Sequence, residues 1–255
     1  MREEVLEGGN ASGPVVRVGD TVRKAWTAAT PHIVAYVRAM RDGGVDAPEP
    51  LGRDAQGRQI IEFIPGTLAM DAAPLSAAEL GCVGDMVRRI HDVSARYVPA
   101  AEAIWEPPLS APAQELICHN DLAPWNLMLG DRWVFIDWDG ASPSTRSWDL
   151  AFSAQTFALP DPTRDPQRSA DDLAAFVDGY GADAELRAVL GHDALAHAGD
   201  ARPAALVRGG GARAVGDHVP HGSRGALGGG ARLCHRASGC VAARPGVTAS
   251  PVRFS

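Results

Sequence analysis

Closely spaced cysteines and long apolar runs are both missing from this 255-residue chain. Its four cysteines lie far apart, which argues against a disulfide framework or a zinc site and favours a reducing cytoplasm. No apolar stretch approaches the roughly 18 residues that span a membrane, and none follows the N-terminus as in a signal peptide. We therefore expect a cytoplasmic protein with no membrane partner.

Lysine is almost absent, and the arginines are concentrated at one end. Lys24 is the only lysine, and residues 201–255 hold eight arginines against a single acid, Asp217. The formal net charge is −7, so the first 200 residues are strongly acidic. Because nucleic-acid binding needs a basic face, we expect no nucleic-acid partner. An acidic body would suit a cationic small molecule, although acidity also simply keeps proteins soluble.

Residues 1–66 are predicted to be rich in β-strands, with one helix among them. Val15–Val18 and Thr21–Trp26 flank Gly19-Asp20, which is a strong signal for a hairpin with a two-residue turn. Gln59–Ile64 is predicted to form a further strand.

Apolar side chains at helical spacing, preceded by capping residues, predict the helices. They are expected at about residues 31–41, with Thr30 as cap; from Ser76 to His91, with Ser76 and Glu79 as a capping box; at about 170–180, with Ser169 as cap; and at about 183–197. This periodicity stops after about residue 200. Residues 201–255 are rich in glycine, alanine and arginine, so we expect a disordered basic tail or a frameshifted product there, not a functional domain.

A second hairpin is predicted in the middle of the chain. Leu127–Leu129 and Trp133–Ile136 are short apolar strands on either side of Gly130-Asp131, again a signal for a two-residue turn. Such a turn places Asn126 and Asp137 at the same open end of the hairpin, about two residues out of register. At roughly 3.3 Å per residue, the two side chains are close enough to share one ion.

The residue types at this end of the hairpin match the needs of phosphoryl transfer. An amide oxygen and a carboxylate with vacant positions suit magnesium, which keeps several waters and binds substrate phosphates. Asp121 precedes Asn126 by five residues, and a carboxylate beside a metal–phosphate site can accept a proton from an attacking hydroxyl or orient it. Each residue alone is better explained as a turn or cap residue, so the hypothesis depends on the joint pattern.

The segments His119–Asn126 (HNDLAPWN) and Ile136–Trp138 (IDW) resemble the aminoglycoside phosphotransferase and choline kinase-like family, which is related to protein kinases. This resemblance implies an α+β, two-lobed protein kinase-like fold. Its small antiparallel-sheet N-lobe would span residues 1–66 and bind the nucleotide. Its mainly helical C-lobe would span residues 67–200 and carry the catalytic loop and the metal hairpin.

The same resemblance implies roles for individual residues. Asp121 matches the catalytic aspartate, and Asn126 and Asp137 match the magnesium ligands. His119 is similar to the structural histidine of the catalytic loop. Asp149, in the sequence SWDLA, resembles an aspartate that braces that loop without taking part in the chemistry.

Two residue pairs of the N-lobe are further candidates for nucleotide binding. Gly9 and Asn10 lie in a glycine-rich stretch whose backbone N–H groups could cover phosphates, although a plain loop explains it equally well. A kinase also needs a cation for the phosphates, and Arg23 and Lys24 point to opposite faces of one strand, so only one can serve. Many relatives carry the basic residue at the position that matches Arg23, which favours Arg23 slightly.

The hinge between the lobes is expected at Phe63 and Ile64, where backbone groups would meet adenine; an ordinary strand end is the alternative. One departure from the family concerns the helix at about residues 31–41. It offers no glutamate to pair with the phosphate-binding cation, and its only acid is Asp42, at its end.

We therefore expect a kinase that transfers the γ-phosphate of ATP or GTP, with Mg²⁺, to a hydroxyl group of an aminoglycoside-like or amino-alcohol substrate. One alternative is a nucleotide-binding pseudo-kinase without turnover, which the missing glutamate and the unusual tail would favour. Another is a metal-dependent hydrolase that uses His119 and Asp121, although no second histidine lies near His119 to complete a metal site. The sequence leaves the acceptor and the oligomeric state open.

Overall fold

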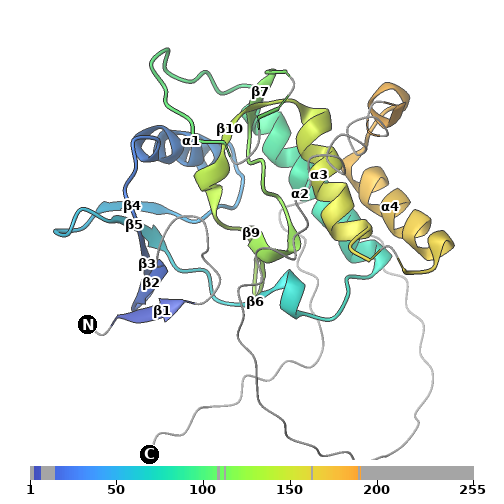
Figure 1. Ribbon diagram of the computed structural model, residues 1–255, viewed down its shortest axis with the longest axis horizontal. Coiled ribbons are helices and arrows are strands. Elements are labelled where there is room, and N and C mark those ends of the chain that lie inside the picture. The colour runs from blue at the N-terminus through green and yellow to red at the C-terminus, as the bar shows by residue number, and fades with distance from the viewer. Residues whose placement is uncertain are drawn as a thin grey trace, which may run out of the picture.

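The computed structural model describes residues 3–6, 15–107, 110–111, 113–161, 163–188 and 190. An antiparallel sheet forms one side of the molecule and a mainly helical part forms the other, with short strands between them (Figure 1). This arrangement confirms the predicted α+β class. Residues 201–255, where a tail or a frameshift is expected, lie outside the described part of the chain, and so do Gly9 and Asn10.

The N-terminal sheet has five strands in the order β1-β2-β3-β5-β4, and all neighbours are antiparallel. The strands are β1 (Glu4–Leu6), β2 (Val15–Val18), β3 (Thr21–Lys24), β4 (Pro50–Arg53) and β5 (Gln59–Glu62). The predicted hairpin is confirmed: Val18 pairs with Thr21, and Gly19 adopts the positive φ of 62° that a tight turn demands. β3 is the middle strand, so the side chains at its end lie deep in the molecule.

Helix α1 (Thr30–Asp42) begins slightly earlier than the sequence predicts, and Thr30 is not its cap. The N-cap residue is Ala29, which makes no side-chain hydrogen bond to the helix. The hydroxyl of Thr30 instead accepts a hydrogen bond from the backbone N–H of Thr27 at 2.9 Å. The predicted cap is therefore wrong, because this hydroxyl serves the turn before the helix.

The helical side contains α2 (Ala77–Ser94), α3 (Arg146–Ala158) and α4 (Pro166–Tyr180); residues 184–188 are also helical. The capping box of α2 is confirmed, since the Ser76 hydroxyl accepts from the N–H of Glu79 at 3.3 Å and the Glu79 carboxylate accepts from the N–H of Ser76 at 2.8 Å. Among the described residues, no helix combines the length and the apolar character that a membrane span requires.

The start of α4 differs from the prediction. Its cap is Asp165, whose carboxylate accepts from the backbone N–H of Arg168 at 2.9 Å, and Pro166 occupies the first turn. Ser169 lies inside the helix, so its predicted role as cap is wrong. Aspartate followed by proline is itself a strong start signal, and it extends the helix beyond the apolar stripe on which the prediction depended.

Helices α2 and α4 pack so closely that their backbones touch at glycines. A Cβ atom added to Gly84 would lie 2.1 Å from the carbonyl oxygen of Phe176, and one added to Gly179 would lie 2.1 Å from the carbonyl oxygen of Gly81. Any larger residue at Gly84 or Gly179 would force the helices apart. α4 is therefore fixed against α2 along its last turns.

Short strands connect the two sides of the molecule. β6 (Thr67–Leu68), β8 (Leu127–Leu129) and β9 (Trp133–Phe135) form one small sheet, and β7 (Leu116–Cys118) pairs with β10 (Ser142–Ser144). Single turns of 3₁₀-helix lie at η1 (Ala69–Asp71), η2 (Pro124–Asn126) and η3 (Trp138–Gly140).

The β8–β9 hairpin exists as predicted, but its turn is one residue longer. Leu129 pairs with Trp133, so the connection holds three residues, Gly130 to Arg132. The extra residue is Arg132, whose guanidinium forms ion pairs with Asp46 and Glu62 instead of joining the ladder. The longer turn brings Asn126 and Asp137 closer to direct register than a two-residue turn would.

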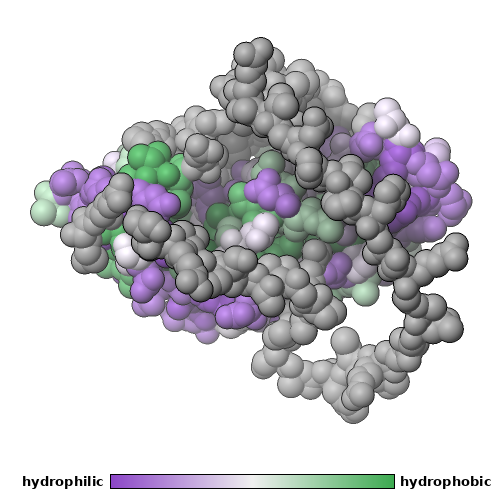
Figure 2. Space-filling view, turned by 90° about the horizontal axis from the view of Figure 1, so that it is seen from below, coloured by the Kyte–Doolittle hydropathy of each residue, from purple (hydrophilic) through white to green (hydrophobic). Residues whose placement is uncertain are grey.

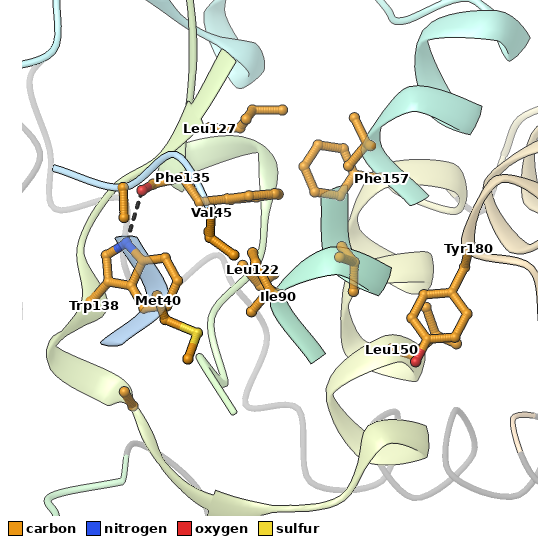
Figure 3. Close-up of a cluster of buried hydrophobic side chains, with 14 of the residues drawn as sticks. Met40, Val45, Ile90, Leu122, Leu127, Phe135, Trp138, Leu150, Phe157 and Tyr180 are labelled. Carbon is orange, nitrogen blue, oxygen red and sulfur yellow. Dashed lines mark hydrogen bonds between the residues drawn. The ribbon is translucent and has the colours of Figure 1, made fainter. Parts of the chain in front are cut away.

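One cluster of buried side chains joins the two sides of the molecule. It runs from α1, with Met40, through Trp138 and Phe135 to Phe157 and Tyr180 on the helical side (Figure 3). The indole N–H of Trp138 donates to the carbonyl of Phe135 at 2.9 Å, so the polar atom of this buried ring is satisfied. The segment after β9 is thus anchored in the core.

Candidate active site

A cavity of about 390 Å³ lies between the N-terminal sheet and the β8–β9 hairpin. Its walls are mostly apolar, with contributions from Val15, Val22, Ile33, Val34, Val37, Ile61, Met128 and Ile136. Its polar lining includes Lys24, Asn126, Asp137 and Asp139. Hydrophobic surface also gathers near the middle of the face seen from below (Figure 2). A large apolar cavity with a few convergent polar groups is the usual form of a small-molecule site.

Asp121 lies on the loop between β7 and η2, and both of its carboxylate oxygens accept hydrogen bonds. The amide nitrogen of Asn126 donates to Oδ2 at 2.7 Å, and the indole N–H of Trp125 donates to Oδ1 at 3.1 Å. Burial raises the pKa of Asp121, while nearby His119 and these two donors oppose that rise. The carboxylate is therefore oriented, partly desolvated and placed beside the cavity.

His119 is fully buried beneath the loop and both of its ring nitrogens are engaged. Nε2 lies 3.2 Å from the carbonyl oxygen of Ile136, and Nδ1 accepts from the N–H of Asp121 at 3.3 Å. Its ring packs against Trp138, with centroids 4.7 Å apart. Because the ring is buried and both of its nitrogens are engaged, His119 has no nitrogen available for a metal ion. Its contacts support the loop that carries Asp121.

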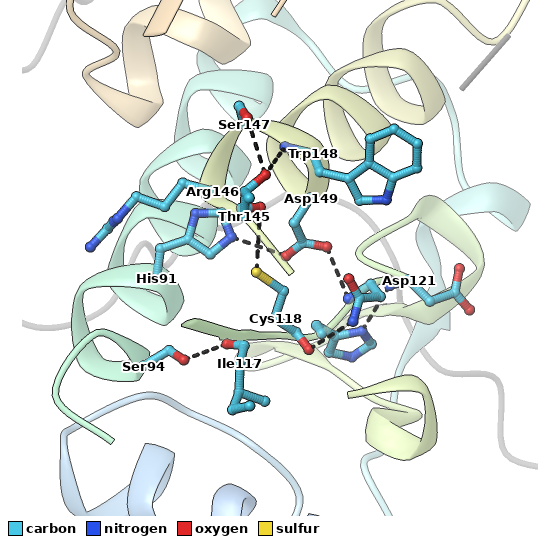
Figure 4. A network of polar contacts seen from close by, with 12 residues as sticks. His91, Ser94, Ile117, Cys118, Asp121, Thr145, Arg146, Ser147, Trp148 and Asp149 are labelled. Carbon is cyan, nitrogen blue, oxygen red and sulfur yellow. Dashed lines mark hydrogen bonds and ion pairs between the residues drawn. The ribbon is translucent and has the colours of Figure 1, made fainter. Parts of the chain in front are cut away.

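Asp149, near the start of α3, bonds the catalytic loop to the helical side (Figure 4). Its Oδ1 accepts from the backbone N–H of Asn120 at 2.9 Å, and its Oδ2 lies 3.0 Å from Nε2 of His91. Nδ1 of His91 in turn lies 2.9 Å from the hydroxyl of Tyr180. All three side chains are buried, so the network has little freedom to rearrange.

Asn120 fixes the backbone immediately before Asp121. It has a positive φ of 62°, and its side-chain nitrogen lies 3.2 Å from the carbonyl oxygens of Cys118 and Gly140 and 2.8 Å from the hydroxyl of Ser142. A left-handed backbone is costly for residues other than glycine and persists where neighbours enforce it. Here these contacts hold the left-handed turn immediately before Asp121.

Asn126 and Asp137 meet at the end of the hairpin, as the sequence predicts. The N–H of Ile136 donates to the carbonyl of Asn126 at 2.8 Å. Asn126 therefore lies opposite Ile136, and Asp137 is on the adjacent rung of the hairpin. Asp137 is the other described residue besides Asn120 that has a positive φ without being glycine, with φ 60°. An amide oxygen and a carboxylate on this rim are ligands that Mg²⁺ accepts.

The cation in the cavity is Lys24. It is 6% exposed, and its ammonium group contacts the carboxylates of Asp137 and Asp139. Burial alone would lower the pKa of Lys24, but Asp139 and Asp137 more than offset this effect and the pKa is raised. Arg23 points to the opposite face, where it contacts Asp54 at 3.5 Å. The residue that faces the cavity is thus Lys24 and not Arg23, which the sequence slightly favours; binding of phosphate by either residue stays a prediction.

The expected hinge residues, Phe63 and Ile64, both line the cavity. The backbone N–H of Phe63 already donates to the carbonyl of Asp20 at 3.0 Å, and the guanidinium of Arg17 lies 3.8 Å above its ring. Because Pro65 has no N–H, the N–H of Ile64 is the donor in this stretch that we expect to meet a nucleobase. Gly9 and Asn10 stay predictions, since they lie outside the described residues.

Two residues at the site are missing from the sequence-based prediction. Trp125 belongs to the quoted motif, but its indole bond to Asp121 depends on the η2 turn, which motif spacing does not show. Asp139 follows Asp137 by two residues, and both carboxylates contact Lys24 from a segment whose backbone is left-handed at Asp137. A pair of acids separated by one residue after an apolar strand is a signal that could have identified Asp139.

Comparison with known proteins agrees with this geometry. Residues 97–192 match the model of the phosphotransferase enzyme family, and this segment contains the catalytic loop, the hairpin and Asp149. The resemblance that the sequence shows to this family is thereby confirmed.

Individual relatives are distant. The trifolitoxin immunity protein of Rhizobium leguminosarum bv. trifolii is 28% identical over 159 residues, which cover 59% of this chain and 60% of that protein. Amicoumacin kinase hAmiN, solved with AMP-PNP and Ca²⁺, aligns with a TM-score of 0.57 at 14% identity over 80% of this chain and 85% of its own. A microcompartment-associated aminopropanol kinase aligns with a TM-score of 0.58 at 15% identity over 75% and 80%. These two structures share the kinase-like fold with this chain.

Proposed function

We propose that this protein transfers the γ-phosphate of ATP or GTP, in the presence of Mg²⁺, to a hydroxyl group of a small molecule. The observation that carries the proposal is the position of Asp121. Its carboxylate is held by Asn126 and Trp125 next to a cavity that also presents Lys24 and Asp137. A base, a cation and metal ligands around one cavity are the parts that phosphoryl transfer needs.

The cavity would hold the nucleotide with its base between apolar walls and its phosphates toward the polar end. Lys24 would bind the phosphates by charge. Asn126 and Asp137 would hold magnesium, which neutralises phosphate charge when it is bound. The described residues fit such an ion, since they offer a carboxylate and an amide oxygen on neighbouring rungs of the hairpin.

Asp121 would orient the acceptor hydroxyl and receive its proton. The raised pKa of Asp121, which burial causes, brings this carboxylate closer to the working pH and makes it a better base than an exposed aspartate. Its two hydrogen bonds hold the oxygens in place before substrate arrives, so less ordering is needed in the transition state.

For the acceptor, we propose an aminoglycoside-like compound or an amino alcohol. The net charge of −7 and the carboxylates of Asp137 and Asp139, which line the cavity, favour a cationic compound. A solved relative of the same fold is an aminopropanol kinase, which makes small amino alcohols the first compounds to test. A cytoplasmic setting is part of this proposal, and the buried Cys118 forms no disulfide.

The two alternatives from the sequence fare differently. Both ring nitrogens of His119 are engaged and its side chain is fully buried, which opposes a hydrolase with His119 as metal ligand. Two features favour a pseudo-kinase, the missing helix glutamate and the unusual tail. In the structure Lys24 has carboxylate partners from elsewhere, which weakens the first of them, and the tail lies outside the described residues.

The decisive experiment is a transfer assay with ATP or GTP, Mg²⁺ and a panel of amino alcohols, aminoglycosides and other hydroxylated metabolites. We expect a phosphorylated product, detected by mass spectrometry, that disappears in the Asp121→Asn variant. Nucleotide binding without transfer to any acceptor would favour the pseudo-kinase. Failure to bind nucleotide at all would contradict the proposed function.

A further inference from the structure

Lys24 is held by carboxylates that come from one segment of the helical side. Its side chain is 7% exposed, and its ammonium group contacts Asp137 and lies 2.5 Å from the carboxylate of Asp139. Gln59, the partner of Lys24 in strand pairing, directs its amide nitrogen to the carbonyl of Ala25 at 3.2 Å. Glu62 also lines the cavity, but its carboxylate contacts Arg132.

Helix α1 lies where a carboxylate partner for this lysine is expected in a kinase-like site. The side chains it contributes to the cavity are apolar, namely Ile33, Val34 and Val37. Its single acid, Asp42, is at the end of the helix. Among the described residues, the carboxylates that contact Lys24 therefore come from the segment after β9.

The two acids that contact Lys24 are not equivalent once magnesium and nucleotide bind. Under the proposed function, Asp137 is a metal ligand, and its charge is then shared with the ion. Asp139 would remain as the carboxylate that belongs to Lys24 alone. Without it, a buried ammonium group would be free to swing toward the metal ligand or away from the phosphates.

The position of Asp139 is fixed by its surroundings. It lies in η3, next to buried Trp138, whose indole N–H is bonded to the core and whose ring packs 5.9 Å from that of Tyr36 on α1. The N–H of Ala141 closes the turn by donating to the carbonyl of Trp138 at 3.0 Å. A carboxylate on such a rigid turn can hold a flexible lysine side chain in one place.

The geometry points to Asp139 as a positioning residue that holds Lys24 ready for the nucleotide phosphates, in place of the acid that α1 does not supply. This inference rests on the proposed function, since it assigns a role at the same site. Asp139 acts through Lys24 and does not itself bind the metal.

The test compares nucleotide binding in matched variants. Calorimetry with a non-hydrolysable ATP analogue is run over a range of Mg²⁺ concentrations on the full chain, on Asp139→Asn, on Asp137→Asn and on Asp131→Asn, which changes an exposed acid of the β8–β9 turn. We expect Asp139→Asn to weaken binding of the analogue roughly 10-fold while leaving the Mg²⁺ concentration for half-maximal effect within about 2-fold. Asp137→Asn should shift the Mg²⁺ requirement, and Asp131→Asn should change neither quantity.

A second measurement uses Lys24 as the only lysine of the chain. Protein labelled with ¹³C-lysine gives one lysine side-chain signal, and at a fixed pH we expect Asp139→Asn to move that signal toward the position of free lysine. If Asp139→Asn does not fold, Asp139→Ser removes the same charge with less bulk and replaces it in both measurements.

Two results would overturn the inference. One is Asp139→Asn with the wild-type affinity and an unmoved Lys24 signal. The other is Asp139→Asn with the same shift in Mg²⁺ requirement as Asp137→Asn, which would make Asp139 a metal ligand. If the unmodified protein fails to bind the analogue, the proposed function fails instead, and this outcome is visible before any variant is made.

Discussion

The two walls of the cavity are stabilised in opposite ways. On the helical side, the polar groups around Asp121 bond to one another and to nearby backbone, through Asn120, Asn126 and Asp149. On the sheet side the wall is mostly apolar, and its one buried cation, among the described residues, is Lys24, whose partners belong to the opposite wall. The proposed catalytic carboxylate, Asp121, is thus positioned without the nucleotide, whereas Lys24 is positioned only where the two walls meet.

The largest effect should follow from removing the carboxylate itself. We expect Asp121→Asn to lower kcat by about 10²–10⁴-fold, because an oriented base or orienting group contributes that much. Nucleotide affinity should stay within roughly 3-fold of wild type, since the sheet wall and Lys24 are untouched. Steady-state kinetics and calorimetry measure the two quantities. Near-normal turnover would show that Asp121 is not the catalytic aspartate.

The internal bracing of the helical wall can be broken at Asp149. Replacing it with alanine leaves His91 and the backbone N–H of Asn120 without their buried partner, so we expect a loss of about 3 kcal/mol in the free energy of unfolding. Urea unfolding followed by circular dichroism measures the change. Asp165→Ala, which removes a surface helix cap, is the control and should cost only about 1 kcal/mol.

The metal site lies where the two walls meet. We expect Asp137→Ala to raise the Mg²⁺ concentration needed for nucleotide binding by roughly 10–100-fold, because one of the two proposed ligands is lost. Lys24 would also lose one of its contacts, but Asp139 would remain. A calorimetric titration with the same magnesium dependence in wild type and variant would exclude Asp137 as a ligand.

The smallest effect concerns Trp125, a side chain that is 37% exposed at the edge of the cavity. Its indole donates to the ionised form of Asp121 and so lowers the pKa of that carboxyl, in opposition to burial. Trp125→Phe should raise this pKa further, so the acidic limb of the profile of kcat/KM against pH should move to higher pH. At neutral pH we expect a loss of roughly 5-fold. An unmoved acidic limb would contradict a role for this bond.

Sequence reasoning was most successful where spacing alone determines geometry. The motif from His119 to Asn126 and the hairpin after it lie close together along the chain, so their meeting at one site follows from strand pairing. Asp149 lies farther along the chain from the loop that it bonds to, but it belongs to a recognisable motif of its own, SWDLA. The predicted roles of Asp121, Asn126 and Asp137 remain predictions that the experiments above test.

Sequence reasoning was least successful where contacts between distant parts of the chain determine which of two adjacent residues faces the site, or how long a turn is. Nothing local distinguishes Arg23 from Lys24, and the choice is made by Asp137 and Asp139, more than a hundred residues away. The turn after Leu129 is one residue longer than its Gly-Asp signal predicts, and the additional residue, Arg132, forms ion pairs with partners outside the hairpin. Local propensity ranks the options, and tertiary contacts select among them.

The glycine contact between α2 and α4 has a consequence for the shortest fragment that could function. Because the backbones touch at Gly84 and Gly179, α4 fits α2 in one position, and its last residue, Tyr180, bonds to His91. His91 in turn meets Asp149, and Asp149 holds the backbone next to Asp121. A recombinant fragment trimmed soon after the last sequence motif, at residue 151, would keep every proposed catalytic side chain and yet lose the far end of this chain of bonds.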